Sequence, residues 1–128
     1  MSDHTRELLD LNQRLLESIA TGDWNVYAML CDPSLTCFEP EARGHLVEGM
    51  AFHKFYFELE RSSAPRTTTM ASPHVRMLGS AAAVVSYIRL TQTPDAGGAP
   101  VTTATNETRV WQRQGTTWKH VHFHRSPA

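Results

Sequence analysis

The chain has 128 residues, of which 41% are apolar and 20% charged, and its formal net charge is -1. A chain of this length can bury its own core, so residues 1–128 are expected to form a single folded domain. The near-neutral charge, the lack of a long apolar run and the lack of a secretory signal argue against nucleic-acid binding, membrane insertion and secretion, and predict a cytoplasmic protein.

Helices are predicted in the first half of the chain. In residues 5–21, leucine and isoleucine recur at helical spacing and form one apolar stripe, and Gly22 is a typical stop. Asp23 is a suitable N-cap for a second, short helix that ends before Pro33. A third helix is predicted over residues 49–60. Its expected packing side chains are Met50, Phe52, Phe55, Tyr56 and Leu59.

Strands are predicted in the second half, after two short extended segments at 35–39 and 45–48. Val, Ile, Thr, Tyr and Trp become frequent, and glycine-containing or proline-containing turns separate the segments at hairpin spacing. Helices followed by hairpins indicate an α+β fold with a curved antiparallel sheet, helices on one face and a pocket between them. The predicted strands are residues 67–78, 81–93, 102–114 and 117–125.

Three arginines on these strands are the first candidates for a site. Because side chains alternate along a strand, Arg89 and Arg125 are expected on the apolar face, on either side of Thr105, with Arg109 further along the middle strand. A buried guanidinium must be paired. The partner is either an anionic ligand, whose carboxylate matches the guanidinium fork, or a protein carboxylate. The candidate carboxylates are Glu39, Glu41, Glu48 and Glu107.

Histidines and cysteines are the other reactive side chains. His120, His122 and His124 alternate with Val121 and Phe123 and are therefore expected on the face opposite Arg125, where an oligomer interface is favoured over a metal site. No other cluster has the spacing of a metal site, so neither a metal nor a cofactor is expected. Cys31 and Cys37 are expected to be reduced and buried.

Eight segments, in order and with few gaps, resemble the association domain of calcium/calmodulin-dependent protein kinase II. The resemblance runs from about the first helix to the C-terminus, which makes it far more specific than one short motif. The segments are residues 31–33 (CDP), 35–42 (LTCFEPEA), 46–50 (LVEGM), 52–58 (FHKFYFE), 73–75 (PHV), 87–92 (YIRLTQ), 107–111 (ETRVW) and 121–126 (VHFHRS).

The resemblance implies a cone-shaped fold of the cystatin-like, nuclear-transport-factor-two-like superfamily, in which the curved sheet wraps around a long N-terminal helix. It also implies dimers that assemble into closed rings. The pocket of that family holds three arginines, a tyrosine and a histidine, and resembles one that accepts small carboxylates. The matching residues here are Arg89, Arg109, Arg125, Tyr27 and His53.

The sequence leaves more than one function open. The first hypothesis is an oligomeric hub with a small-carboxylate pocket and no catalytic residue. The second is a small acid/base enzyme of the isomerase or dehydratase type, whose base is His53 or one of the possible pocket carboxylates Glu39, Glu48 and Glu107. A third is an interaction module with a vestigial pocket.

Kinase activity is not expected from this chain. The sequence contains no kinase motif, and no regulatory or calmodulin-binding basic segment precedes Met1, so calmodulin binding is not expected either. The loop 59–66 is shorter than in the kinase hubs and lacks their tryptophan, which predicts a different pocket flap and different ring contacts.

Overall fold

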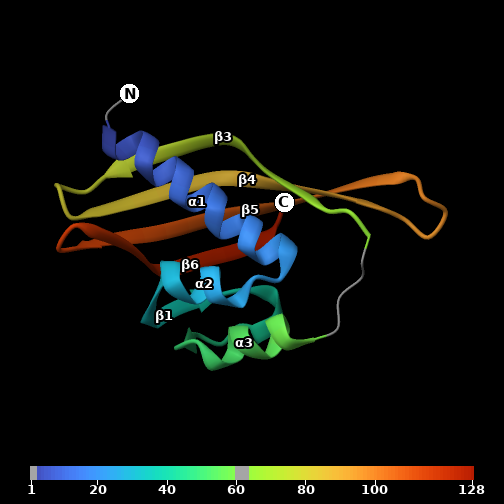
Figure 1. Cartoon of the computed structure of the whole chain (residues 1–128), viewed down its shortest axis with the longest axis horizontal. Coiled ribbons are helices and arrows are strands. Elements are labelled where there is room, and N and C mark those ends of the chain that lie inside the picture. The colour runs from blue at the N-terminus through green and yellow to red at the C-terminus, as the bar shows by residue number, and fades with distance from the viewer. Residues whose placement is uncertain (1–2, 60–63) are drawn as a thin grey trace.

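A computed structural model describes residues 3–59 and 64–128, and it confirms the α+β class (Figure 1). Residues 60–63 lie outside the described part, and with them the centre of the segment in which a different flap was expected. The elements in chain order are α1 (Asp3–Thr21), α2 (Trp24–Leu30), β1 (Cys31–Phe38), the 3-10 helix η1 (Pro40–Ala42), β2 (Val47–Glu48), α3 (Ala51–Glu58), β3 (Thr67–Met77), β4 (Ala82–Pro94), β5 (Pro100–Gln114) and β6 (Thr117–Pro127).

The helix α1 lies across one face of the sheet and supplies much of the core (Figure 1). Its leucines Leu8, Leu15 and Leu16 are fully buried, as their helical spacing predicted. Asn12 is buried among them and accepts a hydrogen bond from the indole Nε1 of Trp111, at 3.0 Å. Polar and apolar contacts together therefore fix the position of α1 on the sheet.

A six-stranded sheet in the order β2-β1-β6-β5-β4-β3 forms the body of the fold. Its long hairpins are antiparallel, and only the pair β1–β6 is parallel. Arg89 lies opposite Thr105, as expected, whereas Arg125 lies opposite Glu107. The sheet therefore places Glu107 close to the arginines.

A β-bulge in β6 overturns the prediction that three histidines share one face. His120 is paired with Trp111 and His122 with Val110, so Val121 is an extra residue that reverses the alternation. His120 is fully buried on the inner face, whereas His122 and His124 remain on the outer face. A single inserted residue leaves no periodic signal, so the sequence pattern did not reveal it.

The helix α3 is less deeply packed than its composition suggested. Phe55 is 59% exposed and Leu59 is 48% exposed, so neither belongs to the core of this protomer. The side chain that α3 buries most deeply is His53, which faces β1. The helix α3 therefore contributes His53 to the interior, with Phe52 and Phe57 packed against the edge of the core.

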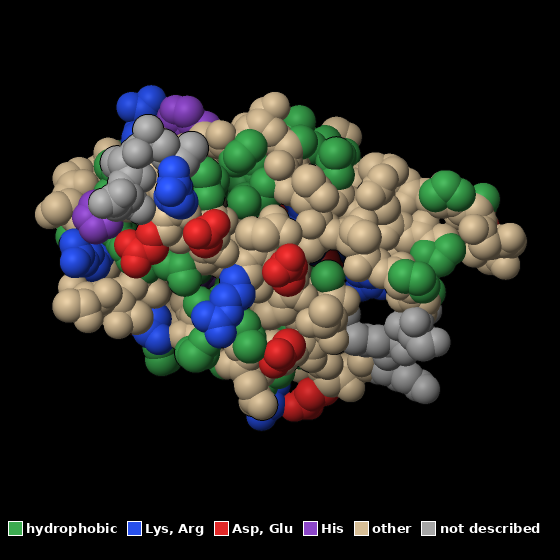
Figure 2. All heavy atoms as spheres, turned by 45° about the horizontal axis from the view of Figure 1, so that its top comes forward, with side chains coloured by type: hydrophobic (Ala, Val, Ile, Leu, Met, Phe, Trp, Pro, Cys, Tyr) green, Lys and Arg blue, Asp and Glu red, His purple; other side chains and the backbone are tan. Residues whose placement is uncertain are grey.

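Acidic and basic side chains are interspersed on the face of the molecule that Figure 2 shows. Apolar patches lie between them. Such a face creates no broad electrostatic field of one sign. Among the described residues, no helix is long and apolar enough to span a membrane.

Candidate functional site

A cavity of about 210 Å³ opens between the helices and the inner face of the sheet. It is smaller than the roughly 300 Å³ at which pockets for drug-sized ligands begin, so its size suits a small molecule. Its walls combine aromatic rings with an unusual density of charge. The polar residues that line it are Tyr27, Glu39, Glu41, His53, Tyr56, Arg89, Arg109 and Arg125.

Arg109 at the base of the cavity is tied into the protein interior. It is 1% exposed, and its Nη2 lies 3.0 Å from Glu107 Oε1. Its Nε donates to the hydroxyl of Tyr87 at 2.8 Å, and its Nη1 lies 3.4 Å from His120 Nε2. Burial alone would lower the pKa of Arg109, but Tyr87 and Glu107 raise it above its usual value. All three guanidinium nitrogens thus have protein partners.

Glu107 is the carboxylate that holds two of the arginines. Its Oε2 lies 3.0 Å from Arg89 Nε, although that contact lacks the alignment of a hydrogen bond. Burial alone would raise the pKa of Glu107, but the charges of Arg109 and Arg89 lower it, so the group remains ionised. Among the described residues, none accepts a hydrogen bond from the terminal nitrogens of Arg89. These donors are available at the cavity wall.

Arg125 on β6 is held by two carboxylates from the segment that follows β1. Its Nη2 donates to Glu39 Oε2 at 3.3 Å and forms a short ion pair with Glu41. Burial alone would lower the pKa of Arg125, but the hydrogen bond and charge of Glu41 raise it. Glu41 is 37% exposed, so this ion pair lies at the solvent-facing side of the cavity.

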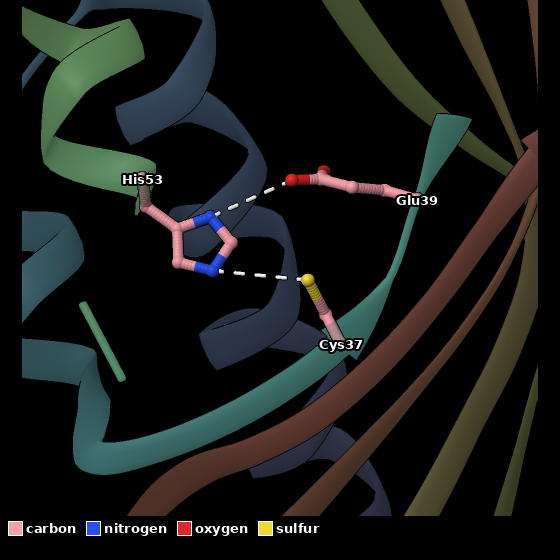
Figure 3. A group of neighbouring side chains, drawn as sticks. All are labelled: Cys37, Glu39 and His53. Atoms are coloured by element: carbon pink, nitrogen blue, oxygen red, sulfur yellow. Dashed lines mark hydrogen bonds and ion pairs between the residues drawn. The ribbon is translucent and has the colours of Figure 1, made fainter. Parts of the chain in front are cut away.

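His53 and Tyr27 form the aromatic side of the cavity. The two imidazole nitrogens of His53 face different partners: Nδ1 lies 3.8 Å from Glu39 Oε1, and Nε2 lies 3.8 Å from Cys37 Sγ (Figure 3). Burial lowers the pKa of His53 to about 4, so the ring is uncharged at neutral pH and its contact with Glu39 is not an ion pair. Tyr27 packs with the ring of Phe57 at a centroid distance of 4.9 Å.

The structure brings most of the candidate site residues together, but two of the possible pocket carboxylates do not line the cavity: Glu107 lies behind it, bound to Arg89 and Arg109, and Glu48 lies away from it. Glu48 is exposed on β2, opposite Thr36, and does not line the cavity. Sequence reasoning did not include Cys37 in the site. Strand alternation offered a signal, since Cys37 shares parity with Glu39. Cys37 and Cys31 are both buried free thiols, as expected.

The pH dependence of the free energy of unfolding should depend on His120. Burial, together with the charge of Arg109, holds the pKa of His120 well below its usual value, whereas in the unfolded chain it is about 6.5. Below that pH the unfolded chain binds the extra proton, so the free energy of unfolding falls by up to about 1.4 kcal/mol per pH unit. Urea unfolding between pH 7.5 and 5 should therefore show a shallower pH dependence for His120→Gln. The exposed His45→Gln, in the loop before β2, is the matched control and should keep the wild-type slope.

Comparison with known proteins agrees with the fold and the resemblance described above. The family model "Calcium/calmodulin dependent protein kinase II association domain" matches residues 4–128. The delta subunit of calcium/calmodulin-dependent protein kinase type II from Oryctolagus cuniculus is 50% identical over 123 residues. These residues are 94% of this chain but only 23% of that protein.

Solved structures agree with the family match along nearly the whole chain. The CaMKII hub homology domain of Chlamydamonas reinhardtii is 54% identical, with a TM-score of 0.94 over 98% of this chain and 99% of that one. The association domain of C. elegans CaMKII is 43% identical, with a TM-score of 0.90 over 96% and 95% of the two chains. A nuclear transport factor 2-like protein from Salmonella enterica, 24% identical over 95% and 89% of the two chains, has a TM-score of 0.74 and shows the fold alone. The chain therefore belongs to the family of calcium/calmodulin-dependent protein kinase II association domains.

Proposed function

We propose that this chain is a self-association domain, a hub whose copies assemble with one another. The observation that carries the proposal is the end-to-end match, in sequence and in fold, to association and hub domains. The proposal assigns this chain neither kinase catalysis nor calmodulin binding. A cytoplasmic location is part of the same proposal.

The outer face of the sheet is the surface that supports self-association. It carries Ile88 on β4, which is 41% exposed, and Phe38 on β1, which is 39% exposed. The rings of His122 and His124 lie against Phe38 at centroid distances of 6.2 and 5.8 Å. Apolar side chains on an open sheet face are typical of an interface, and a second copy of the chain is the partner that the family assignment favours.

A charge on this face should break the assembly. Ile88→Asp would place a carboxylate in the proposed apolar contact, and an unpaired charge there is costly to desolvate. We expect size-exclusion chromatography with light scattering to show a lower mass for Ile88→Asp than for the wild type, with an unchanged circular dichroism spectrum.

Val101→Asp is the matched control, because Val101 is 40% exposed but its strand parity places it on the opposite face. It should keep the wild-type mass. Equal masses for Ile88→Asp and the wild type would show that copies do not meet on this face.

The cavity forms the second part of the proposal, as a site for a small carboxylate. Arg89 and Arg125 would contact the ligand, because each has guanidinium donors that no described residue occupies. Arg109, whose donors are used internally, would hold Glu107 and thereby position Arg89. A ligand carboxylate would replace Glu41 on Arg125, so the net charge of the site would be preserved.

One observation favours an acid/base enzyme as a second candidate. Burial raises the pKa of Glu39, against the opposing charge of Arg125, and Glu39 lies in the cavity beside the neutral ring of His53. A carboxyl group shifted in this direction is suited to proton transfer. Exchange of solvent deuterium into a small 2-keto acid, followed by NMR, separates the two candidates, since a hub without catalysis leaves the exchange rate unchanged.

A further inference from the structure

Three side chains of different chemistry converge at one wall of the cavity. Cys37 lies in β1, Glu39 follows the end of that strand and His53 lies in α3 (Figure 3). Each side chain offers one donor atom to the group: a sulfur, a carboxylate oxygen and an imidazole nitrogen. These three atoms lie within 4.8 Å of one another. Cys37 is fully buried, and the side chains of Glu39 and His53 are 9% and 6% exposed.

Regular backbone structure holds this group in place. Cys37 is paired on both sides, with Val47 of β2 and Phe123 of β6. The turn into α3 is fixed by Gly49, whose amide donates to Leu35 of β1 at 2.7 Å and whose φ of 81° suits glycine. The helix therefore returns onto β1, which places the imidazole over Cys37.

The donor set matches what a borderline metal ion requires. Zn²⁺ binds thiolate at about 2.3 Å and imidazole or carboxylate at about 2.0–2.2 Å, so tetrahedral geometry separates the sulfur and nitrogen donors by about 3.6 Å. The distance from Cys37 Sγ to His53 Nε2 is 3.8 Å. Cys37 Sγ and His53 Nε2 are thus close to the separation that one ion requires, whereas Glu39 Oε1, which lies 3.8 Å from His53 Nδ1, must turn around the ring to reach the same ion.

A second feature supports a ligand role for Glu39. Its Oε2 is held by Arg125 at 3.3 Å, which leaves Oε1 facing His53. A hydrogen bond from outside to the second oxygen of a carboxylate is the usual way in which proteins orient metal ligands. Arg125 would therefore retain Glu39 beside the cavity through Oε2, while Oε1 turns from His53 Nδ1 toward the ion.

We propose that Cys37, Glu39 and His53 bind a divalent transition-metal ion of the Zn²⁺ type. The ion has three protein ligands, and its fourth position is directed to the cavity that Glu39 and His53 line. On binding, the thiol of Cys37 gives its proton to the buffer and ligates as the thiolate. A water molecule or a small anion in the cavity completes the coordination. The proposal goes beyond the hub function and requires neither assembly nor a carboxylate ligand.

A nucleophilic cysteine is the competing interpretation of the same three residues. The imidazole lies between thiol and carboxylate, as in cysteine hydrolases. Cys37, however, is fully buried and does not line the cavity, so a substrate carbon has no access to its sulfur. A single ion between the side chains needs no such access, and metal binding is therefore favoured.

Cobalt absorption spectroscopy tests the proposal on the full chain at pH 7.5. Co²⁺ bound by a thiolate gives a sulfur-to-metal charge-transfer band in the near ultraviolet, and tetrahedral geometry gives intense visible bands. Both are expected in the wild type and should be lost in Cys37→Ala. Cys31→Ala is the matched control, because Cys31 is the other buried free thiol and lies outside the group; it should retain both bands.

A second variant keeps the test decisive if Cys37→Ala folds poorly. Glu39→Gln preserves the shape of the side chain and should weaken Co²⁺ binding at least about tenfold, by analogy with the loss of orienting groups at metal sites. Zn²⁺ should raise the Tm of the wild type more than that of Glu39→Gln.

The absence of a charge-transfer band in the wild type, or its persistence in Cys37→Ala, would overturn the proposal. So would a metal signal that is lost in His122→Ala alone, which would place the ion on the outer face of the sheet. Each of these outcomes is independent of the solution mass, so a failed metal site leaves the hub proposal unaffected.

Discussion

Glu107→Gln should lower the free energy of unfolding by about 3–5 kcal/mol, the cost of leaving a buried charge without its partner. Glu107 is 2% exposed and lies within ion-pair distance of both Arg109 and Arg89. It also accepts a hydrogen bond from the hydroxyl of Tyr87 at 2.7 Å. The neutral amide would keep the shape of the side chain but would leave two guanidinium groups without their buried carboxylate.

Urea denaturation of Glu107→Gln and Glu48→Gln measures this cost. Glu48 is exposed and outside the cavity, so its amide variant should differ from the wild type by no more than about 0.5 kcal/mol. A loss below about 1 kcal/mol for Glu107→Gln would contradict the assignment of Glu107 as the anchor of the arginines.

Arg89→Gln should weaken the binding of a small carboxylate about 10-fold to 100-fold. The estimate follows from the 1.5–3 kcal/mol of a hydrogen bond to a charged group. Arg89 is the informative position because Glu107 keeps its ion pair with Arg109 in this variant, which limits damage to the fold. Isothermal titration calorimetry with small hydroxy acids, beginning with lactate, measures the affinity.

Arg76→Gln is the control for this measurement. Arg76 is exposed on β3 and paired with Val84, away from the cavity, so its removal changes the net charge equally without touching the site. Equal affinities of Arg89→Gln and the wild type would remove Arg89 from the proposed site. An equal loss in Arg76→Gln would indicate a general charge effect.

The three arginines differ in their contacts in this structure. Arg109 is fully engaged with Glu107, Tyr87 and His120, and it acts as a fixed positive charge beneath the cavity. Arg89 and Arg125 lie at the wall and have donors that no residue in the described ranges 3–59 and 64–128 occupies. If the proposed carboxylate binds, Arg109 supplies buried positive charge while Arg89 and Arg125 contact the ligand.

Much of this fold follows from patterns that the sequence contains. Helical spacing of leucines predicted α1, and the turns predicted the long hairpins, because both are local features. Strand alternation was sufficient to place Arg89 on the inner face, since β4 and β5 pair without interruption at that position. The resemblance to a known family supplied Tyr27 and His53, which no pattern singles out.

The remaining features depend on contacts between distant residues. The ion pair of Arg125 with Glu41 joins residues 84 positions apart, and no periodicity encodes it. The bulge at Val121 moved His120 into the interior and left His122 outside, which reversed the predicted face of one histidine. Cys37 lies beside His53 because α3 folds back onto β1, a contact between distant segments.

The solution mass of the wild-type chain, measured by light scattering after size exclusion over a range of concentrations, tests the hub proposal most directly. A protomer has a mass of 14.4 kDa. The proposed function predicts a stable species whose mass is an even multiple of that value, as expected for dimers that assemble further. A mass of one protomer at every concentration would contradict self-association and would leave the cavity as the functional centre of the protein.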